Sequence, residues 1–152
     1  MKQDTTINIF AKTLGNECVA TRIRLISRAI SRIYDEALRP QGVKTTQLSI
    51  LAVVSILGQA APAEICRILY LEGSTLSRNT KRMMNKGWLE AARAKDRRAR
   101  RLRLTPEGNQ LLIKAFPSWR EAQEKVLAML GEDNLGAIEN IVQAVWYSSA
   151  GG

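Results

Sequence analysis

Residues 74–105 read STLSRNTKRMMNKGWLEAARAKDRRARRLRLT, and this stretch decides the fold. Up to Gly87 its apolar residues have helical spacing, and the positions expected to face inward are Leu76, Thr80, Met83 and Met84. Two short runs, 88–91 and 102–105, then flank a basic turn and predict the strands of a hairpin. The stretch therefore predicts a short helix followed by a β-hairpin, or wing.

The same stretch holds the whole excess of positive charge. The chain has 23 Lys and Arg residues against 14 Asp and Glu residues, a net charge of +9. Residues 74–105 contain 11 of the basic residues, whereas the acidic ones there are Glu90 and Asp96. The rest of the chain is balanced, with 12 of each sign. A solvated basic face is normally interspersed with carboxylates, so this concentration indicates contact with nucleic-acid phosphates.

Two short helices are predicted upstream of the hairpin. We expect Thr45 or Thr46 to cap a helix that Gly58 ends and whose inward positions are Leu48, Leu51, Ala52 and residues 55–57. Pro62 suits the first turn of a following helix, AEICRILYL, because proline gives up only an amide that is unpaired there. Gly73 is expected to break that helix before the one that begins at Ser74. Short helices joined by a tight glycine turn predict a helix-turn-helix.

Longer helices are predicted on both sides of this motif. An amphipathic helix is expected over 19–38, with arginines on its solvent face or at a dimer rim. Thr105 and Pro106 form a helix start, and the helix should run to Leu130 with a kink or break at Pro117. A last helix is expected over 133–147, followed by a frayed SSAGG end.

Composition excludes several other classes of protein. The 152 residues suit one domain, and 45% hydrophobic with 24% charged residues is typical of a globular protein. No apolar run is long enough to span a membrane and the start does not resemble a secretion signal, so a cytoplasmic location is expected. The chain has two cysteines and no histidine, which disfavours a disulfide framework, Cys/His zinc sites and histidine-based catalysis. We therefore expect no cofactor, no metal and no enzymatic activity.

The wing segment KDRRARRLRLTPEGNQLL (95–112) resembles the wing of the MarR family of transcription regulators. The matching positions are Asp96, Arg98, Leu102, Leu104, Thr105 and Gly108. The segments LSRNTKRMMNKGWLE and YDEALRPQGVKTTQLSIL resemble the family's recognition helix and the approach to its DNA-binding lobe, so the resemblance covers nearly the whole chain. The chain departs from the family at Gly73 and Ser74, where arginine or aspartate is frequent, and at Cys66, where alanine is common; these departures bear on which bases are read.

This resemblance implies a mainly α fold with a small β-hairpin wing. The winged helix-turn-helix lobe would occupy 43–106, and residues 1–40 and 107–150 would form a helical dimerisation region within a single domain. It implies a homodimer, joined by its N- and C-terminal helices, that binds pseudo-palindromic double-stranded DNA and regulates transcription, more often as a repressor. Apolar residues near both ends agree with an interface of this kind; they are Ile7, Ile9, Phe10, Leu14, Ile141, Val142, Val145, Trp146 and Tyr147.

Candidate DNA contacts fall on the second helix of the motif and on the wing. The helix should enter the major groove, where Arg78 can bond guanine and Asn79 can bond adenine, although either can instead contact phosphate. The other helix candidates are Ser74, Thr75, Ser77, Lys81 and Arg82. The wing candidates for a narrow minor groove are Arg97, Arg98, Arg100 and Arg101. Asp96 is interpreted as a brace for Arg98 rather than as a catalytic carboxylate.

Control by oxidants or by a ligand stays open at this point. Some relatives respond to oxidants through cysteine, and Cys18 opens a helix whose dipole favours the thiolate, but buried cysteines are usually inert. Cys66 lies beside apolar residues and is expected to be a small buried hydrophobe. The family also binds small phenolic or lipophilic effectors. Tyr34, Leu48 and Trp119 could line such a site, although side chains at this spacing more often form plain core.

Two competing classes remain. The same charge suits an architectural or nonspecific nucleic-acid-binding protein, for which affinity would depend steeply on salt and little on sequence. A hydrolase or transferase would need paired carboxylates in a cleft. The acidic pairs at 35–36 and 132–133 lie beside helix ends, where capping or solvated roles are ordinary.

Overall fold

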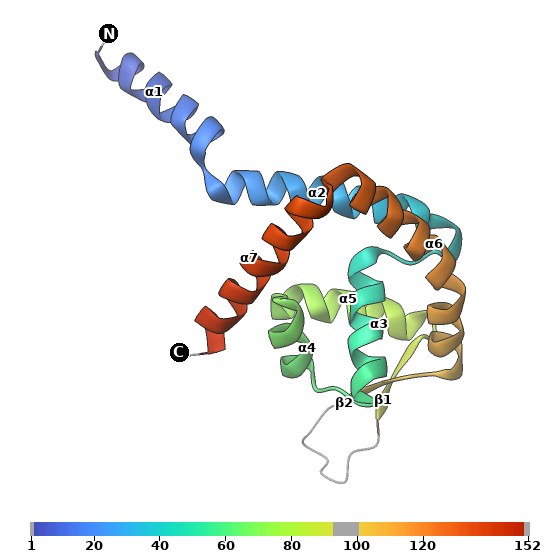
Figure 1. The fold of residues 1–152 in the computed structure, drawn as a ribbon. Helices are drawn as coiled ribbons and strands as arrows, with labels where there is room; N and C mark the ends of the chain where they lie inside the picture. The colour runs from blue at the N-terminus through green and yellow to red at the C-terminus, as the bar shows by residue number, and fades with distance from the viewer. Residues whose placement is uncertain (1, 93–100, 151–152) are drawn as a thin grey trace. The chain divides into compact units, whose positions relative to one another are not determined.

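The computed structural model describes residues 2–92 and 101–150, and they are mainly helical (Figure 1). The chain consists of two compact units, Met1–Ile33 and Tyr34–Gly152. Within the described residues, no helix is both long enough and apolar enough to cross a membrane.

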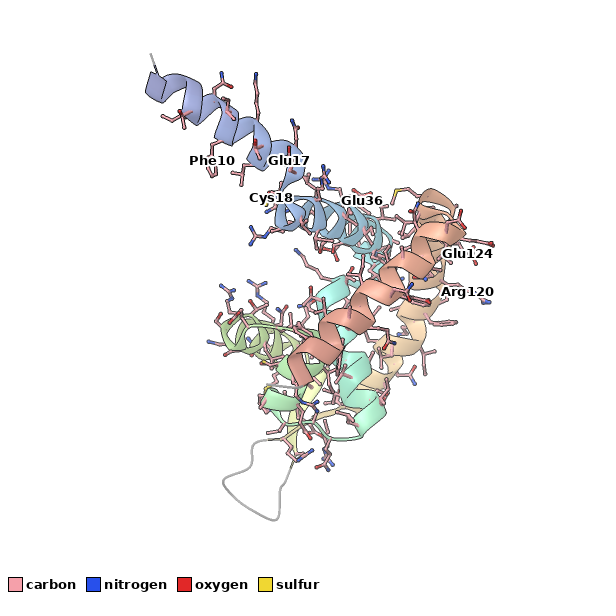
Figure 2. All side chains as sticks on the ribbon, turned by 60° about the vertical axis from the view of Figure 1, so that its left-hand side comes forward. Phe10, Glu17, Cys18, Glu36, Arg120 and Glu124 are labelled. Carbon is pink, nitrogen blue, oxygen red and sulfur yellow. The ribbon has the colours of Figure 1, made fainter. Side chains whose placement is uncertain are left out.

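The first unit contains α1 (Lys2–Glu17) and most of α2 (Val19–Ala37), with Cys18 at the junction between them (Figure 2). The helix predicted over 19–38 is confirmed, and its arginines at 22, 24, 28 and 32 are exposed. Among the residues that the structure describes, however, several on its apolar face are exposed. The exposed apolar residues of the unit include Ile7, Ile9, Phe10, Leu14, Val19, Ile23 and Ile26. In Figure 2, Phe10 projects away from the axis of α1.

The second unit carries the helix-turn-helix and the wing. After the end of α2 follow a 3-10 turn, η1 (Arg39–Gln41), and the helices α3 (Thr45–Leu57), α4 (Pro62–Leu69) and α5 (Gly73–Asn85). Strands β1 (Leu89–Ala92) and β2 (Arg101–Leu104) form an antiparallel hairpin. The chain then continues as α6 (Pro106–Leu130) and α7 (Glu132–Ala150).

The core of this unit lies where α3, α4, α5, the hairpin and α6 meet. Its largest fully buried side chains are Leu38, Ile50, Leu51, Val54, Ile65 and Met83. Each such side chain stabilises the fold by about 1.5–3 kcal/mol. On α5 the predicted inward residues Leu76 and Met83 are buried and Thr80 is half-buried, but Met84 is 42% exposed. A helix turns 100° per residue, so Met83 returns to the face of Leu76 and Met84 overshoots it.

Two expectations for α3 are wrong. Its N-cap residue is Lys44, so neither threonine is the cap; Thr45 is instead the first helical residue. Two other side chains accept hydrogen bonds from the backbone N–H groups at the start of α3. Asp35 Oδ1 accepts from Thr45 N at 2.7 Å, and Gln47 Oε1 accepts from Lys44 N at 3.1 Å. At the other end residues 55–57 are exposed rather than inward, because α3 there runs past the core.

The turn between α4 and α5 does not depend on glycine. Tyr70 ends α4 in the left-handed conformation, with φ 50°, and Leu71 N donates to Cys66 O at 3.0 Å. Gly73, expected to break the helix, is instead the first residue of α5. The T-shaped contact between the rings of Tyr70 and Trp146, 6.1 Å apart, helps to hold a conformation that is rare for residues other than glycine.

Of the kink or break predicted at Pro117, the break is wrong, because α6 is continuous through it. A proline inside a helix removes one hydrogen bond, but Ala115 and Ala122 are fully buried on either side of it and hold both halves against the unit. The helix α7 extends to Ala150, so residues 148–150 are helical and not frayed.

The wing is built on tight contacts at its base. The strands are shifted by one residue from the prediction, and Leu89 pairs with Leu104. As predicted, Thr105 caps α6: its Oγ1 accepts from Gly108 N at 3.0 Å and donates to Gly87 O at 2.5 Å. Gly108 lets α6 approach the hairpin, since a Cβ there would lie 2.1 Å from Trp88 O.

Candidate nucleic-acid interface

The helix α5 presents a cationic face that the core holds in place. Leu76 and Met83 anchor its inner side. Of the predicted contact residues on the helix, the exposed ones are Ser74, Ser77, Arg78, Lys81 and Arg82. Thr75 and Asn79 are half-buried. The helix contains no acidic residue, so nothing on α5 itself neutralises its cations.

The two candidates for base recognition differ in how free their side chains are. Asn79 Nδ2 donates to Thr75 O at 2.9 Å, a bond that fixes the carboxamide against its own helix. Arg78 Nη2 reaches Thr75 Oγ1 at 3.4 Å, which is at the long limit of a hydrogen bond. The Arg78 guanidinium can therefore turn toward a ligand at little cost, whereas Asn79 would have to give up a good bond or use its remaining polar atoms.

The part of the wing that the structure describes contributes little free charge. Arg103 Nε donates to Glu90 Oε1 at 2.8 Å across the hairpin, and Arg101 Nη2 donates to Glu64 Oε2 at 2.9 Å. The other predicted wing residues, Asp96, Arg97, Arg98 and Arg100, lie outside the described residues. Among the predicted contact residues that the structure describes, the cations without a carboxylate partner are those on α5.

Lys86 belongs to the basic stretch but has a structural role. Its Nζ donates to Gly42 O at 2.8 Å and lies 4.5 Å from the centre of the Trp88 ring. The hydrogen bond ties the end of α5 to the turn before α3, and the ring contact holds Lys86 against the residue that precedes β1. A count of charges does not distinguish this lysine from Lys81, because its hydrogen-bond acceptor, Gly42 O, is distant in sequence.

The two cysteines lie in different surroundings. Cys66 is half-buried and packs against the core, in agreement with its interpretation as a small hydrophobe. At the start of α2, hydrogen bonds from the side chain and backbone of Thr21 hold the pKa of the Cys18 thiol below its usual value of 9.0. The pKa is lowered, as predicted, but the main cause is hydrogen bonding to Thr21, with smaller effects from the Ala20 backbone and the charge of Arg24.

A cavity of about 320 Å³ lies between α3 and α6. Its lining residues are Thr45, Leu48, Ser49, Ala52, Leu112, Phe116 and Trp119. Phe116 and Trp119 stack with their ring centres 6.0 Å apart. Two of the three residues considered for an effector site, Leu48 and Trp119, line this cavity. Tyr34 does not; its hydroxyl donates to Gln123 Oε1, and burial raises its pKa.

Comparisons with known proteins agree with this geometry. Residues 43–108 match the family model described as a winged helix DNA-binding domain. The solved structure of the Mycobacterium tuberculosis transcriptional regulator MosR in complex with DNA is 31% identical, with a TM-score of 0.76 over 89% of this chain and 98% of that one. A second solved structure of MosR aligns at 33% identity and a TM-score of 0.75, over 86% and 96% of the two chains.

A curated relative gives a similar result. The multiple antibiotic resistance protein MarR of Salmonella typhimurium is 28% identical over 125 residues, which is 81% of this chain and 87% of that protein.

Proposed function

Because the chain belongs to the MarR family of winged-helix transcription regulators, we propose that it acts as a homodimer that binds a pseudo-palindromic operator and represses transcription from it. At the coarser level the chain is a DNA-binding transcription regulator and not an enzyme. The observation that carries the proposal is the face of α5, which is cationic, exposed and fixed to the core by Leu76 and Met83.

The chemistry of α5 suits the major groove. Arginine bonds O6 and N7 of guanine with two parallel hydrogen bonds, and Arg78 is free to adopt that geometry. Lys81 and Arg82 follow on the exposed side and fit phosphate contacts, together with the hydroxyl groups of Ser74, Thr75 and Ser77. Asn79 is retained as a second base contact that depends on breaking its bond to Thr75 O. The arginines at 97, 98 and 100 are proposed to enter the minor groove, with Asp96 bracing Arg98.

The homodimer is proposed from uncovered apolar surface at both ends of the chain. On α2, Val19, Ile23 and Ile26 follow one another at helical spacing and each is about half exposed or more. On α7, Ile141, Val142 and Val145 are likewise exposed. Uncovered apolar faces of this kind mark association surfaces. The proposed dimerisation region is therefore 1–40 together with 107–150, with the DNA-binding lobe at 43–106.

The operator test uses the full chain and DNA from upstream of its own coding sequence, against a scrambled duplex, at near-physiological salt. Site-specific regulation requires a preference of about a thousandfold. Arg78→Ala should lower the preference, and the matched control Arg120→Ala, on an exposed part of α6 (Figure 2), should not. Equal binding of both duplexes with a steep salt dependence would instead indicate an architectural nucleic-acid-binding protein.

Relief of repression by a small ligand is a second part of the proposal. The α3–α6 cavity is mostly apolar and contains a stacked aromatic pair, which fits a small aromatic or lipophilic molecule. It joins a helix of the DNA-binding lobe to a helix of the proposed dimerisation region, so a bound ligand would favour one spacing of the two. Oxidation at Cys18 is the alternative means of relief, because hydrogen bonds favour its thiolate.

A further inference from the structure

The part of the wing that the structure describes is a short hairpin that needs support at its side. The ladder extends over four residue pairs, from Leu89 with Leu104 to Ala92 with Arg101. A hairpin of this size is marginally stable by itself. The orientation of the hairpin therefore depends on what holds β2 from outside it.

That support comes from the loop between α3 and α4. Ala60 exchanges both backbone hydrogen bonds with Leu102, at 2.8 and 3.0 Å, and so forms an isolated bridge on the outer edge of β2. Next to this bridge, Arg101 Nη2 donates to Gln59 O at 3.2 Å and to Glu64 Oε2 at 2.9 Å. The same Oε2 accepts from Ala61 N at 2.7 Å. One carboxylate thus binds both the N-cap residue of α4 and the first residue of β2.

From this geometry we infer that Glu64 and Arg101 are positioning residues, which set the angle of the wing relative to the helix-turn-helix. Glu64 lies on α4, the first helix of the motif, and α4 packs against α5. The pair therefore links the helix proposed for the major groove to the hairpin proposed for the minor groove. Arg101 acts through this link, and not as a free cation on the DNA. The inference rests on the proposed function.

The inference is testable because loss of the Glu64–Arg101 link and loss of the Glu64 charge should change DNA affinity in opposite directions. Removing the Glu64 carboxylate takes one negative charge away from beside the DNA-binding surface, and this change by itself should strengthen binding to any duplex. Loss of the link should instead weaken binding to the operator, because recognition then requires the wing to be ordered as it binds. Glu90 provides a matched control: its ion pair with Arg103 has the same length to within 0.1 Å and similar exposure, but it lies inside the hairpin.

The experiment measures the affinity of full-length wild type, Glu64→Gln and Glu90→Gln for the operator and for a scrambled duplex. We expect the operator preference of Glu64→Gln to fall about fivefold, the effect of losing one partly exposed ion pair, while scrambled-duplex affinity is unchanged or higher. Glu90→Gln should keep its preference. Arg101→Lys, which leaves the Glu64 bond to Ala61 N intact, should behave like Glu64→Gln, and thermal melting checks that each variant is folded.

Equal preferences in Glu64→Gln, Arg101→Lys and Glu90→Gln would overturn the inference. That result differs from failure of the proposed function, in which the wild type itself would not distinguish the operator from the scrambled duplex.

Discussion

Substituting Gly108 tests whether the close approach of α6 to the wing base is a real constraint. An alanine Cβ at this position would lie 2.1 Å from Trp88 O and 2.8 Å from Leu104 Cδ2, whereas ordinary contact begins at 3.4 Å. The backbone of either α6 or the Trp88 turn would have to move by more than an ångström. Both are held: Thr105 N donates to Trp88 O, and Trp88 N donates to Met83 O.

The change in the free energy of unfolding caused by Gly108→Ala is the sum of two opposing effects. Overpacking a filled site costs about 1–3 kcal/mol, and more where the neighbour is backbone. Alanine favours the helix over glycine by about 1 kcal/mol, which offsets part of that cost. We expect Gly108→Ala to destabilise the protein by about 2 kcal/mol, which lowers the melting temperature by about 6–10 °C for a unit of this size.

The assay is thermal unfolding followed by circular dichroism, with Gly136→Ala as the matched control. Gly136 is also helical, on α7, and a Cβ there meets nothing within 4 Å, so this variant should melt at or slightly above the wild-type temperature. The same melting temperature for both variants would refute the close approach. Gly108→Ala should also reduce operator preference, because the turn at Trp88 that it displaces leads directly into β1.

Other predictions concern the helix cap, the cysteine and the dimer. Thr105→Ala should cost about 1 kcal/mol of unfolding free energy through loss of the α6 cap, and Thr105→Ser should restore most of it in urea titrations; equal losses in both would contradict the cap. Thr21→Val should slow alkylation of Cys18 near pH 7, because loss of the Thr21 hydroxyl raises the thiol pKa toward 9.0 and lowers the thiolate fraction; an unchanged rate would argue against this bond. Ile23→Glu should shift sedimentation toward the monomer, whereas Ile56→Glu, at a residue 82% exposed on α3, should leave it unchanged; a wild-type monomer would rule out the proposed dimer.

The errors of the sequence analysis have a common origin. The apolar pattern predicts that Met84 and residues 55–57 are buried, because they continue the run of apolar positions on their helices. Which face of a helix is buried, however, depends on the elements packed against it. Thr45 was a reasonable cap by residue type, but Asp35, ten residues earlier, already supplies the acceptor. At Pro117 the local rule predicts a kink or a break, and the packing of Ala115 and Ala122 keeps the helix unbroken. In each case the outcome depends on where the rest of the fold lies relative to the segment, which the local pattern does not contain.

The sequence by itself determined the winged helix-turn-helix, the order of its elements and the location of the positive charge. These features are local: apolar periodicity, a Thr-Pro helix start and a cluster of arginines are encoded within a few residues of one another. Only the tertiary structure decided which of the cations are free. It paired Arg101 with Glu64, Arg103 with Glu90 and Lys86 with Gly42 O, and left Arg78 exposed on α5. Charge is a property of each residue, but its availability depends on partners that only folding brings within hydrogen-bond distance.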